Sequence, residues 1–240
     1  MAVRLYLDHP LGAGQSVPLS RDQAQYLFAV MRMKVGDTLL VFNGENGEWR
    51  ASVTEGSKRG GQIRAEEQTR PQSTPPDLWL YFAPIKKART DFIVEKATEL
   101  GVRRICPVQT AFTNSERIRR DRLQAHAIEA AEQCGETYVP EVAEIARLDR
   151  LLDTWPGDRH LVFCDEAHLG ATVDVTSARA PAAILIGPEG GFSDTERARL
   201  LELPNTTRLS LGPRILRADT AAVAAITLWQ AQLGDWESPR

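Results

Sequence analysis

Two loops carry the residues best suited to holding a ligand closely. The first is IGPEGGFS (186–193), with three glycines within five positions, and the second is LSLGPRILR (209–217). Each follows an apolar segment that predicts a buried strand and precedes a segment that predicts a helix. Glycines let the backbone approach a ligand, and ligands of open α/β sheets lie beyond the carboxyl ends of the strands. We therefore expect the loops to form one pocket, although such glycines are almost equally typical of plain tight turns.

Several common active-site motifs are absent from the sequence. Neither loop contains the phosphate-binding pattern G-x-x-x-x-G-K-[ST] or the dinucleotide pattern G-x-G-x-x-G. No G-x-S-x-G motif occurs, and Ser193 with Glu196 three residues later predicts a helix cap rather than a nucleophile. The four histidines are scattered, which favours surface roles over catalysis.

Metal, disulfide and membrane signals are also missing. Cys106, Cys134 and Cys164 lie about thirty residues apart without a Cys-x-x-Cys pair, and we expect all three to be buried, reduced thiols. The N-terminus has no apolar signal region, and no stretch reaches the ~18 apolar residues of a membrane span. These features predict a soluble cytoplasmic protein with no metal.

The charge distribution does not indicate nucleic-acid binding by itself. The net charge is −3, and residues 1–74 hold nine Lys/Arg against eight Asp/Glu. Any RNA-binding surface must therefore be a local patch. Two basic clusters qualify, although such clusters are more often ordinary solvated faces. Their members are Lys86, Lys87 and Arg89, and then Arg117, Arg119, Arg120 and Arg122.

The first seventy residues predict a small β-barrel with one helix. Short, partly alternating segments at 4–8, 37–44, 48–54 and 61–67 predict strands. Ser20 and Gln23 form a capping box that starts a helix between the first two. The proline-rich stretch RPQSTPPD (70–77) predicts a linker. We therefore place domain boundaries at 1–72 and 73–240.

The rest of the chain alternates strand and helix. Predicted strands lie at 79–85, 103–108, 160–165, 182–187 and 207–212, and predicted helices at 91–100, 117–134, 194–203 and 218–233. The continuous apolar runs at 160–165 and 182–187 are typical of parallel strands buried on both faces. This alternation predicts an α/β domain with a mostly parallel sheet.

Together the two loops resemble those of the RsmE-type methyltransferases of the SPOUT superfamily. The segments that carry the resemblance are ILIGPEGGFSDTE (184–196) and LSLGPRILRADTAA (209–222). Further similar stretches are LFAVMRMKVGDTLLVFNG (27–44), KKARTDFIVEKATELGV (86–102) and EAAEQCGETYVPEV (129–142). Two departures occur: Ala218-Asp219 stands where the family commonly has Thr-Glu, and a Gly-Asp often found near Lys87-Ala88 is missing.

The resemblance implies a fold, a reaction and a partner. The implied fold is a PUA-like β-barrel followed by a SPOUT α/β domain with a C-terminal trefoil knot, in a homodimer. The implied reaction is methylation of N3 of one uridine in 16S rRNA, or in the small ribosomal subunit, by S-adenosylmethionine. The implied cofactor residues are Phe163, Ile186, Gly187, Gly190, Gly191, Leu209, Ser210, Leu211, Gly212, Ile215 and Leu216. The candidate RNA contacts are Arg32, Lys86, Lys87, Arg89, Arg117, Arg119 and Arg120.

The reaction itself indicates which side chains to consider as catalytic. A sulfonium methyl donor needs no metal, but uridine N3 carries a proton that a base must remove. Glu189 and Asp219 are the carboxylates nearest the expected pocket, and Arg217 could stabilise negative charge on the uracil oxygens. Each has an alternative: Glu189 could bind backbone N–H groups, Asp219 could cap the last helix, and Arg217 could bind a phosphate.

Two other functions fit the same sequence. One is a non-catalytic RNA-binding or ribosome-assembly protein built on the barrel. The other is a SPOUT methyltransferase that acts on another RNA, since a fold does not fix a target.

Overall fold

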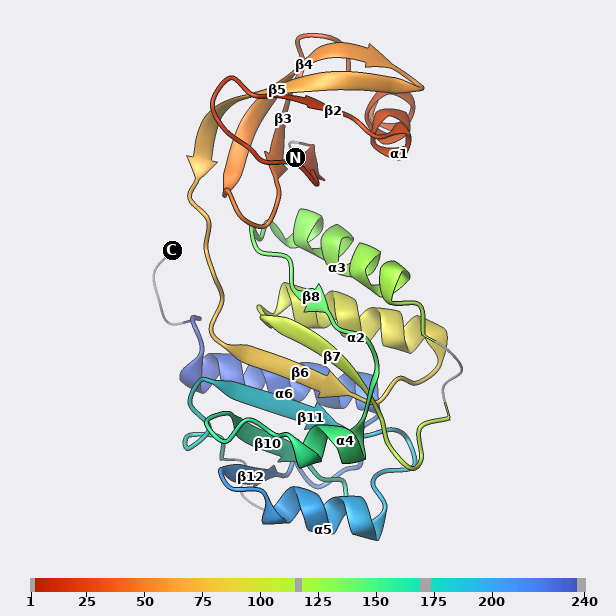
Figure 1. Cartoon of the computed structure of the whole chain (residues 1–240), viewed down its shortest axis with the longest axis vertical. Helices are drawn as coiled ribbons and strands as arrows, with labels where there is room; N and C mark the ends of the chain where they lie inside the picture. The colour runs from red at the N-terminus through yellow and green to blue at the C-terminus, as the bar shows by residue number, and fades with distance from the viewer. Residues whose placement is uncertain (1–2, 115–117, 169–173, 237–240) are drawn as a thin grey trace. The chain divides into compact units, whose positions relative to one another are not determined.

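The computed structural model describes residues 3–114, 118–168 and 174–236, and its chain divides into two compact units (Figure 1). Unit 1 comprises Met1–Thr74 with Ala131–Val139, and unit 2 comprises Pro75–Ala130 with Pro140–Arg240. The segment Ala131–Val139 belongs to unit 1, although it follows residues of unit 2 in the sequence. Nothing in the sequence pattern indicates that return.

Unit 1 contains a five-stranded sheet in the order β1-β3-β4-β5-β2. Its strands are β1 (Arg4–Tyr6), β2 (Ser16–Pro18), β3 (Thr38–Phe42), β4 (Glu48–Ser57) and β5 (Gly60–Arg70). β1 pairs with β3 in parallel, whereas the other pairs are antiparallel. The four predicted strands are present, and β2 is an additional edge strand. Alternating burial along β3 to β5 places Leu39, Val41 and Ile63 in one apolar core.

The helical segment of unit 1 begins where its capping box predicts. The Ser20 side chain accepts a hydrogen bond from the Gln23 N–H, and the Gln23 side chain accepts one from the Ser20 N–H. α1 (Arg21–Ala24) continues as the π-helical segment η1 (Gln25–Val30). Arg32 follows with a left-handed φ of 58°, and its side chain is exposed.

A buried ion cluster joins three segments of unit 1. The Glu48 carboxylate accepts hydrogen bonds from Arg4 at 2.6 Å and Arg70 at 2.8 Å, and also from Thr69. The guanidinium of Arg4 also donates to the backbone oxygens of residues 131 and 136, and that of Arg70 donates to the oxygen of residue 135. This cluster therefore ties the returning segment Ala131–Val139 to the sheet.

Unit 2 is built on a seven-stranded sheet in which every pairing is parallel. The strand order is β12-β10-β11-β6-β7-β8, and β9 also pairs with β7. The strands are β6 (Leu78–Phe82), β7 (Arg104–Gln109), β8 (Glu141–Val142), β9 (Ala146–Arg147), β10 (His160–Cys164), β11 (Ala182–Ile186) and β12 (Thr206–Leu209). The α/β class and the mostly parallel sheet predicted from the sequence are confirmed.

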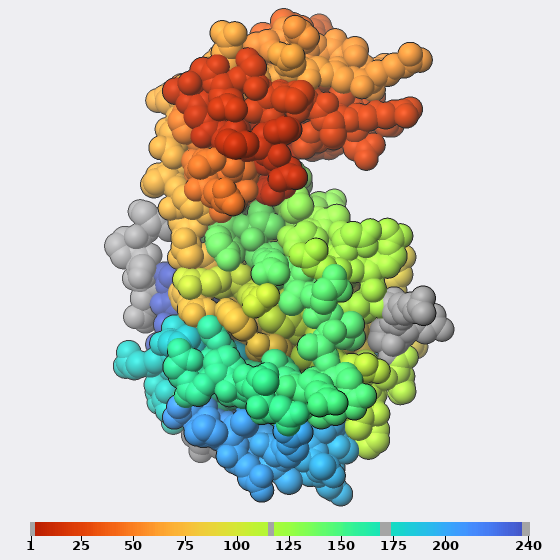
Figure 2. Space-filling view, in the orientation of Figure 1, coloured from red at the N-terminus to blue at the C-terminus, as the bar shows by residue number. Residues whose placement is uncertain are grey.

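Helices cover both faces of this sheet. They are α2 (Lys87–Glu99), α3 (Arg120–Cys134), α4 (Leu148–Asp153), α5 (Asp194–Glu202) and α6 (Ala218–Leu233). α2 packs against α6 on one face, whereas α4 and α5 pack together on the other, where they form much of the surface of this unit in Figure 2. Leu148, Leu152 and Leu200 from α4 and α5 join Leu161 and Leu185 of the sheet in one core. Because their pairings are parallel, the five strands β6, β7, β10, β11 and β12 all end at the same edge of the sheet.

Several local predictions need correction. α2 begins at Lys87, four residues before the predicted start, because its N-cap residue, Lys86, makes no side-chain cap that a sequence pattern could show. The short β8, β9 and α4 were not predicted. Cys106 and Cys164 are buried as expected, but Cys134 is exposed, so the prediction that all three are buried was wrong. Among the helices of the described residues, none is both long enough and apolar enough to cross a membrane.

Candidate active site at the carboxyl edge of the parallel sheet

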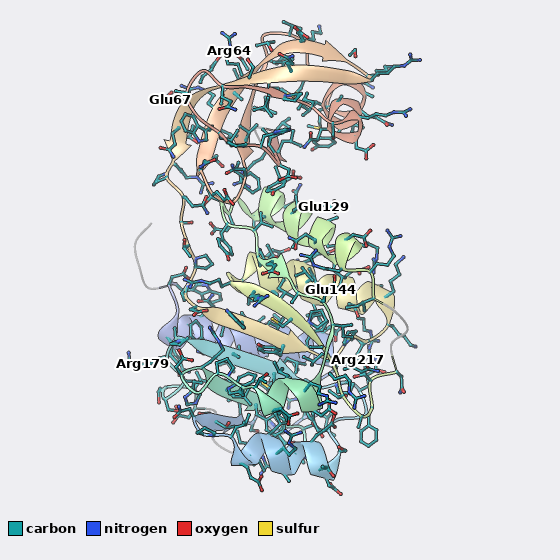
Figure 3. All side chains as sticks on the ribbon, in the orientation of Figure 1. Arg64, Glu67, Glu129, Glu144, Arg179 and Arg217 are labelled. Atoms are coloured by element: carbon teal, nitrogen blue, oxygen red, sulfur yellow. The ribbon has the colours of Figure 1, made fainter. Side chains whose placement is uncertain are left out.

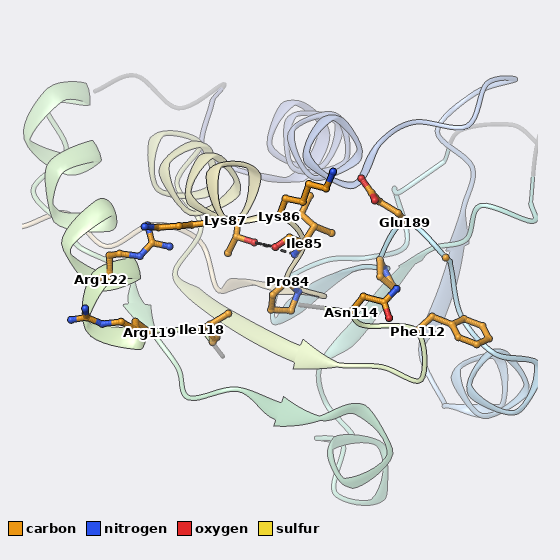
Figure 4. A pocket seen from close by; sticks show the side chains of 13 residues that line it. Pro84, Ile85, Lys86, Lys87, Phe112, Asn114, Ile118, Arg119, Arg122 and Glu189 are labelled. Carbon is orange, nitrogen blue, oxygen red and sulfur yellow. Dashed lines mark hydrogen bonds between the residues drawn. The ribbon is translucent and has the colours of Figure 1, made fainter. Parts of the chain in front are cut away.

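Two cavities lie side by side at the carboxyl edge of the unit 2 sheet. The small cavity, of about 260 Å³, is lined by residues following β10, β11 and β12, which are neighbours in the sheet. The large cavity, of about 720 Å³, is lined by residues following β11, β6 and β7 and by α3 (Figure 4). Pro188 and Glu189, in the loop after β11, line both cavities. The loop after β11 is therefore the wall between them.

The loop after β12 forms most of the small cavity. It lies beside the loop after β11, as the sequence predicts for the two glycine-rich segments. The predicted cofactor residues that line this cavity are Ile186, Gly187, Leu209, Ser210, Leu211, Gly212, Ile215 and Leu216. The first turn of α6 adds Ala218 and Ala221, whose small side chains leave the space open.

Three other predicted cofactor residues do not line the small cavity. Phe163 is fully buried and packs edge-to-face on Phe192, with ring centroids 5.0 Å apart. Gly190 lines the large cavity instead. Gly191 has a φ of 69°, and a side chain there would overlap the Glu166 carboxylate. Gly191 therefore lets the loop after β11 pack against the loop after β10.

The loop after β10 is fixed by a buried carboxylate that the sequence analysis did not identify. Asp165 accepts hydrogen bonds from Arg208 at 2.7 Å, Arg197 at 3.2 Å and the N–H of Ala167. Burial alone would raise the pKa of Asp165, but the Ala167 N–H and the two guanidinium groups lower it overall. Arg197 also holds Glu166 at 2.6 Å. Asp165 and Glu166 both line the small cavity, so this ion cluster sets the shape of its wall.

Two polar groups in the wall of the small cavity differ in what they can do. Burial raises the pKa of the Cys164 thiol to about 12, so this thiol stays protonated and is no nucleophile. The Ser210 hydroxyl is buried, and in the described part of the chain its oxygen has no hydrogen-bond partner. A buried hydroxyl without a partner costs free energy, which a polar ligand in the cavity would recover.

The two candidate bases are joined by an arginine. Arg89, at the start of α2, donates to Glu189 at 2.9 Å and lies 3.8 Å from Asp219 at the start of α6. Glu189 lies between the cavities with 56% of its side chain exposed, whereas Asp219 lines neither cavity and is 19% exposed. Asp219 also accepts a hydrogen bond from the N–H of Thr220. Arg89, predicted as an RNA contact, is thus engaged with carboxylates at the cavity wall.

Arg217 precedes α6 and lines the small cavity. It lies at the carboxyl edge of the sheet, and its side chain is exposed (Figure 3). It makes no side-chain cap of the helix that follows. The N-terminal end of α6 adds a partial positive charge at the same place.

The predicted RNA contacts fall into separate groups. Lys86, Lys87 and Arg119 line the large cavity, together with Arg122. Arg120 donates to the backbone oxygen of Val142 and lines neither cavity. Arg32 lies in unit 1. Arg117 lies outside the described residues.

Comparisons with known proteins agree with this geometry. Residues 72–230 match the family described as RNA methyltransferase domain, and residues 19–66 match RNA methyltransferase PUA domain. The chain belongs to the RNA methyltransferase family. The resemblance to RsmE-type enzymes seen in the sequence is confirmed, as is the PUA-like character of the N-terminal part.

Individual relatives of this RNA methyltransferase cover nearly its whole length. Ribosomal RNA small subunit methyltransferase E of Rickettsia conorii is 32% identical over 229 residues, which is 93% of each chain. The crystal structure of that enzyme from Neisseria gonorrhoeae, bound to S-adenosylmethionine, is 26% identical with a TM-score of 0.89 and covers 98% of this chain and 100% of its own. A Legionella pneumophila methyltransferase with bound S-adenosylmethionine is 30% identical with a TM-score of 0.87, covering 98% and 99%.

Proposed function

We propose that the protein transfers a methyl group from S-adenosylmethionine to N3 of one uridine in 16S ribosomal RNA. The observation that carries this proposal is the pair of cavities divided by the loop after β11. One cavity has glycine-rich walls and the other a basic wall, and Glu189, a candidate base, lines both. The Neisseria and Legionella structures hold S-adenosylmethionine on the same fold, and the Rickettsia relative is named for the small-subunit RNA.

The small cavity suits S-adenosylmethionine in chemistry as well as in position. Its walls combine apolar side chains such as Ile215 and Leu216 with backbone of the loops after β11 and β12. The unpartnered Ser210 hydroxyl offers a hydrogen bond to a polar group of the cofactor. The carboxylates of Asp165 and Glu166, held in place by Arg197 and Arg208, add hydrogen-bond acceptors to the wall for the cofactor's polar groups.

The protein's own residues have two tasks in this reaction. When bound, S-adenosylmethionine supplies an electrophilic methyl group. Glu189 lines both cavities, so it is the better placed of the two acids to accept the N3 proton, and Arg89 orients its carboxylate. Asp219, joined to the same arginine, is the alternative base. Arg217 stabilises the negative charge that develops on the uracil oxygens.

We infer that the enzyme works as a homodimer in the cytoplasm, where it meets 16S rRNA or the small subunit, and that its C-terminal segment forms the trefoil knot typical of SPOUT domains. Among the described residues, no group of three or more His, Cys, Asp or Glu side chains could hold a metal ion.

Mapping of methylated nucleotides in cells lacking the gene tests the assignment. We expect one 3-methyluridine to disappear from 16S rRNA and to return when the wild-type gene is restored. A complete 16S methylation pattern, with a methyl group missing from a transfer RNA or a ribose, would reassign the enzyme to another RNA.

A further inference from the structure

The large cavity has two chemically different ends. Lys87 of α2, Arg122 of α3 and Arg119, which directly precedes α3, lie together at one end (Figure 4). Phe112, Asn114 and Glu189 lie at the other end, next to the wall shared with the small cavity. The cavity is therefore cationic far from the small cavity, and aromatic and polar close to it.

The basic end still has charge available for a ligand. Arg122 pairs with Asp91 at 2.5 Å, and Arg119 pairs with Asp121 at 2.6 Å. Lys87, at this end, is exposed and forms no ion pair within the described ranges 3–114, 118–168 and 174–236; Lys86 is also exposed, but it points toward Glu189 (Figure 4). The Thr90 hydroxyl accepts a hydrogen bond from the Ile85 N–H and donates one to the Ile85 oxygen, each at 3.0 Å, which fixes the turn before α2. Both lysines follow this turn directly.

The other end holds an aromatic residue, Phe112, on the loop after β7. Phe112 is 46% exposed and lines the large cavity, so it is accessible to a ligand there. A Cβ atom on Gly190 would lie 3.2 Å from the Phe112 Cβ, so the glycine allows these two loops to approach. Phe112 thus stands beside the loop that separates the cavities.

The two parts of a nucleotide are chemically complementary to the two ends of this cavity. Its phosphate is anionic, whereas its base is flat and stacks on aromatic rings. N3 lies on the pairing edge of uracil, so a uridine must leave its pair and its stack before N3 can react. The volume of about 720 Å³ falls within the range of roughly 300–1,000 Å³ for pockets that hold small ligands.

We propose that the large cavity holds the single unstacked nucleotide that is methylated, with its base against Phe112 and its phosphate beside Lys87. This assignment rests on the proposed function. It places N3 beside Glu189, which lines both cavities. It also makes Phe112 a substrate-binding residue that the sequence analysis did not identify.

Single-turnover methylation of small ribosomal subunits, prepared from cells lacking the gene, tests this assignment at varied subunit concentration. Phe112→Ala should lower the rate at limiting subunit by about tenfold or more, because base stacking is lost. Phe112→Trp should recover most of that rate. Lys87→Ala should weaken RNA binding and reduce its log–log salt slope by about 0.7–0.9. Lys96→Ala, on the same helix but away from both cavities, is the matched control and should match the wild type.

The outcomes separate this assignment from the function on which it rests. S-adenosylmethionine affinity should stay unchanged in all four variants, because none of the three positions lines the small cavity. A wild type that methylates the subunit, with Phe112→Ala and Lys87→Ala behaving like Lys96→Ala, overturns the nucleotide site alone. A folded wild type that binds S-adenosylmethionine but methylates no small-subunit RNA overturns the proposed function instead.

Discussion

Each unit contains a cluster of arginine and carboxylate groups, and the two clusters differ in exposure. In unit 1, Glu48 is enclosed, with 5% of its side chain exposed, and it binds Arg4, Arg70 and Thr69. In unit 2, Arg89 binds Glu189, whose side chain is 56% exposed, and lies close to Asp219. The oxygens of the Glu48 carboxylate accept hydrogen bonds from donors within unit 1. Glu189 retains room for a ligand on the wall between two cavities.

The two clusters differ in what their charged groups can do: those of the Glu48 cluster can stabilise the fold, and those of the Arg89 cluster can reach a substrate. A buried carboxylate with complete partners is costly to disturb but has no means of reaching a substrate. An exposed ion pair contributes little to stability, so its position at a cavity calls for another explanation. We infer that the Glu48 cluster holds unit 1 together and that the Arg89 cluster serves the reaction. The following variants test that division.

Glu48→Gln should have the largest effect, on stability. Removing one partner of a buried ion cluster costs about 3–5 kcal/mol because the remaining charges lose their compensation. Denaturant unfolding of the full chain measures this cost. Glu67→Gln on the neighbouring strand removes an exposed pair with Arg50 and should cost less than about 1 kcal/mol. An equal loss of unfolding free energy in the two variants would show that the Glu48 cluster does not stabilise unit 1 more than an exposed ion pair does.

The same cluster predicts a pH dependence. Burial acts to raise the pKa of Glu48, but hydrogen bonds from Arg70, Arg4 and Thr69 lower it to about 2. Since the folded pKa is depressed, the stabilisation is complete above the ordinary glutamate pKa and is lost as pH falls toward 2. Unfolding free energy measured between about pH 5 and pH 2, a range that brackets the ordinary and the lowered pKa of Glu48, should fall less in Glu48→Gln than in the wild type.

Arg217→Ala should have the next largest effect, on the chemical step. Loss of a group that stabilises transition-state charge lowers the rate by about 10²–10³. Stability and RNA affinity should change little, since the interaction forms only as charge develops. Arg217→Lys should recover part of the rate, because it keeps the charge but not the planar fork. Arg179→Ala, at the opposite edge of unit 2, provides the control (Figure 3). A normal rate at saturation with weakened RNA binding would make Arg217 a phosphate anchor.

Ala221→Leu should weaken cofactor binding, with a smaller effect than Arg217→Ala has on the rate. The new side chain enters the small cavity from α6, and overpacking costs about 1–3 kcal/mol, or roughly five- to 150-fold in affinity. Calorimetric titration with S-adenosylmethionine, with a chelator present, measures the loss. Ala231→Leu lies on the exposed part of the same helix and should bind normally. Unchanged affinity in a folded Ala221→Leu protein would place the cofactor elsewhere.

Arg89→Ala should have the smallest effect of the series. The exposed pair contributes less than about 1 kcal/mol to stability, but its loss frees the two carboxylates and should slow methylation by about tenfold. RNA binding should keep its salt slope, whereas Lys87→Ala should lower it. A reduced slope in Arg89→Ala would show that this arginine contacts phosphate after all.

Local signals in the sequence were enough to predict much of the fold. Both capping boxes, at Ser20 and Ser193, are present, and α6 has the predicted bounds. The elements that were not predicted are short: β8 and β9 have two residues each, β2 has three and α4 has six, too few to show a clear period. The return of Ala131–Val139 to unit 1 depends on contacts with Arg4 and Arg70, which are distant in the sequence.

The site was predictable where glycines mark the strand ends. The loops after β11 and β12 could be found because glycines lie close to the ends of their apolar runs, whereas Asp165 and Glu166 follow β10 directly and the next glycine in the sequence is Gly170. The same strand-end rule applied to every predicted strand would have found them. The assignment of Gly190 to the large cavity and the link between Arg89 and Glu189 depend on tertiary packing, which no local pattern reports.

The central claim is that one base nitrogen receives one methyl group at the junction of the two cavities. The most direct measurement incubates the purified protein with labelled S-adenosylmethionine and small subunits from cells lacking the gene, and then maps the label by nucleoside mass spectrometry. We predict 3-methyluridine at a single position of 16S rRNA, formed about 10²–10³ times more slowly by Arg217→Ala. Label on a ribose, on another base, or on no RNA at all would contradict the account.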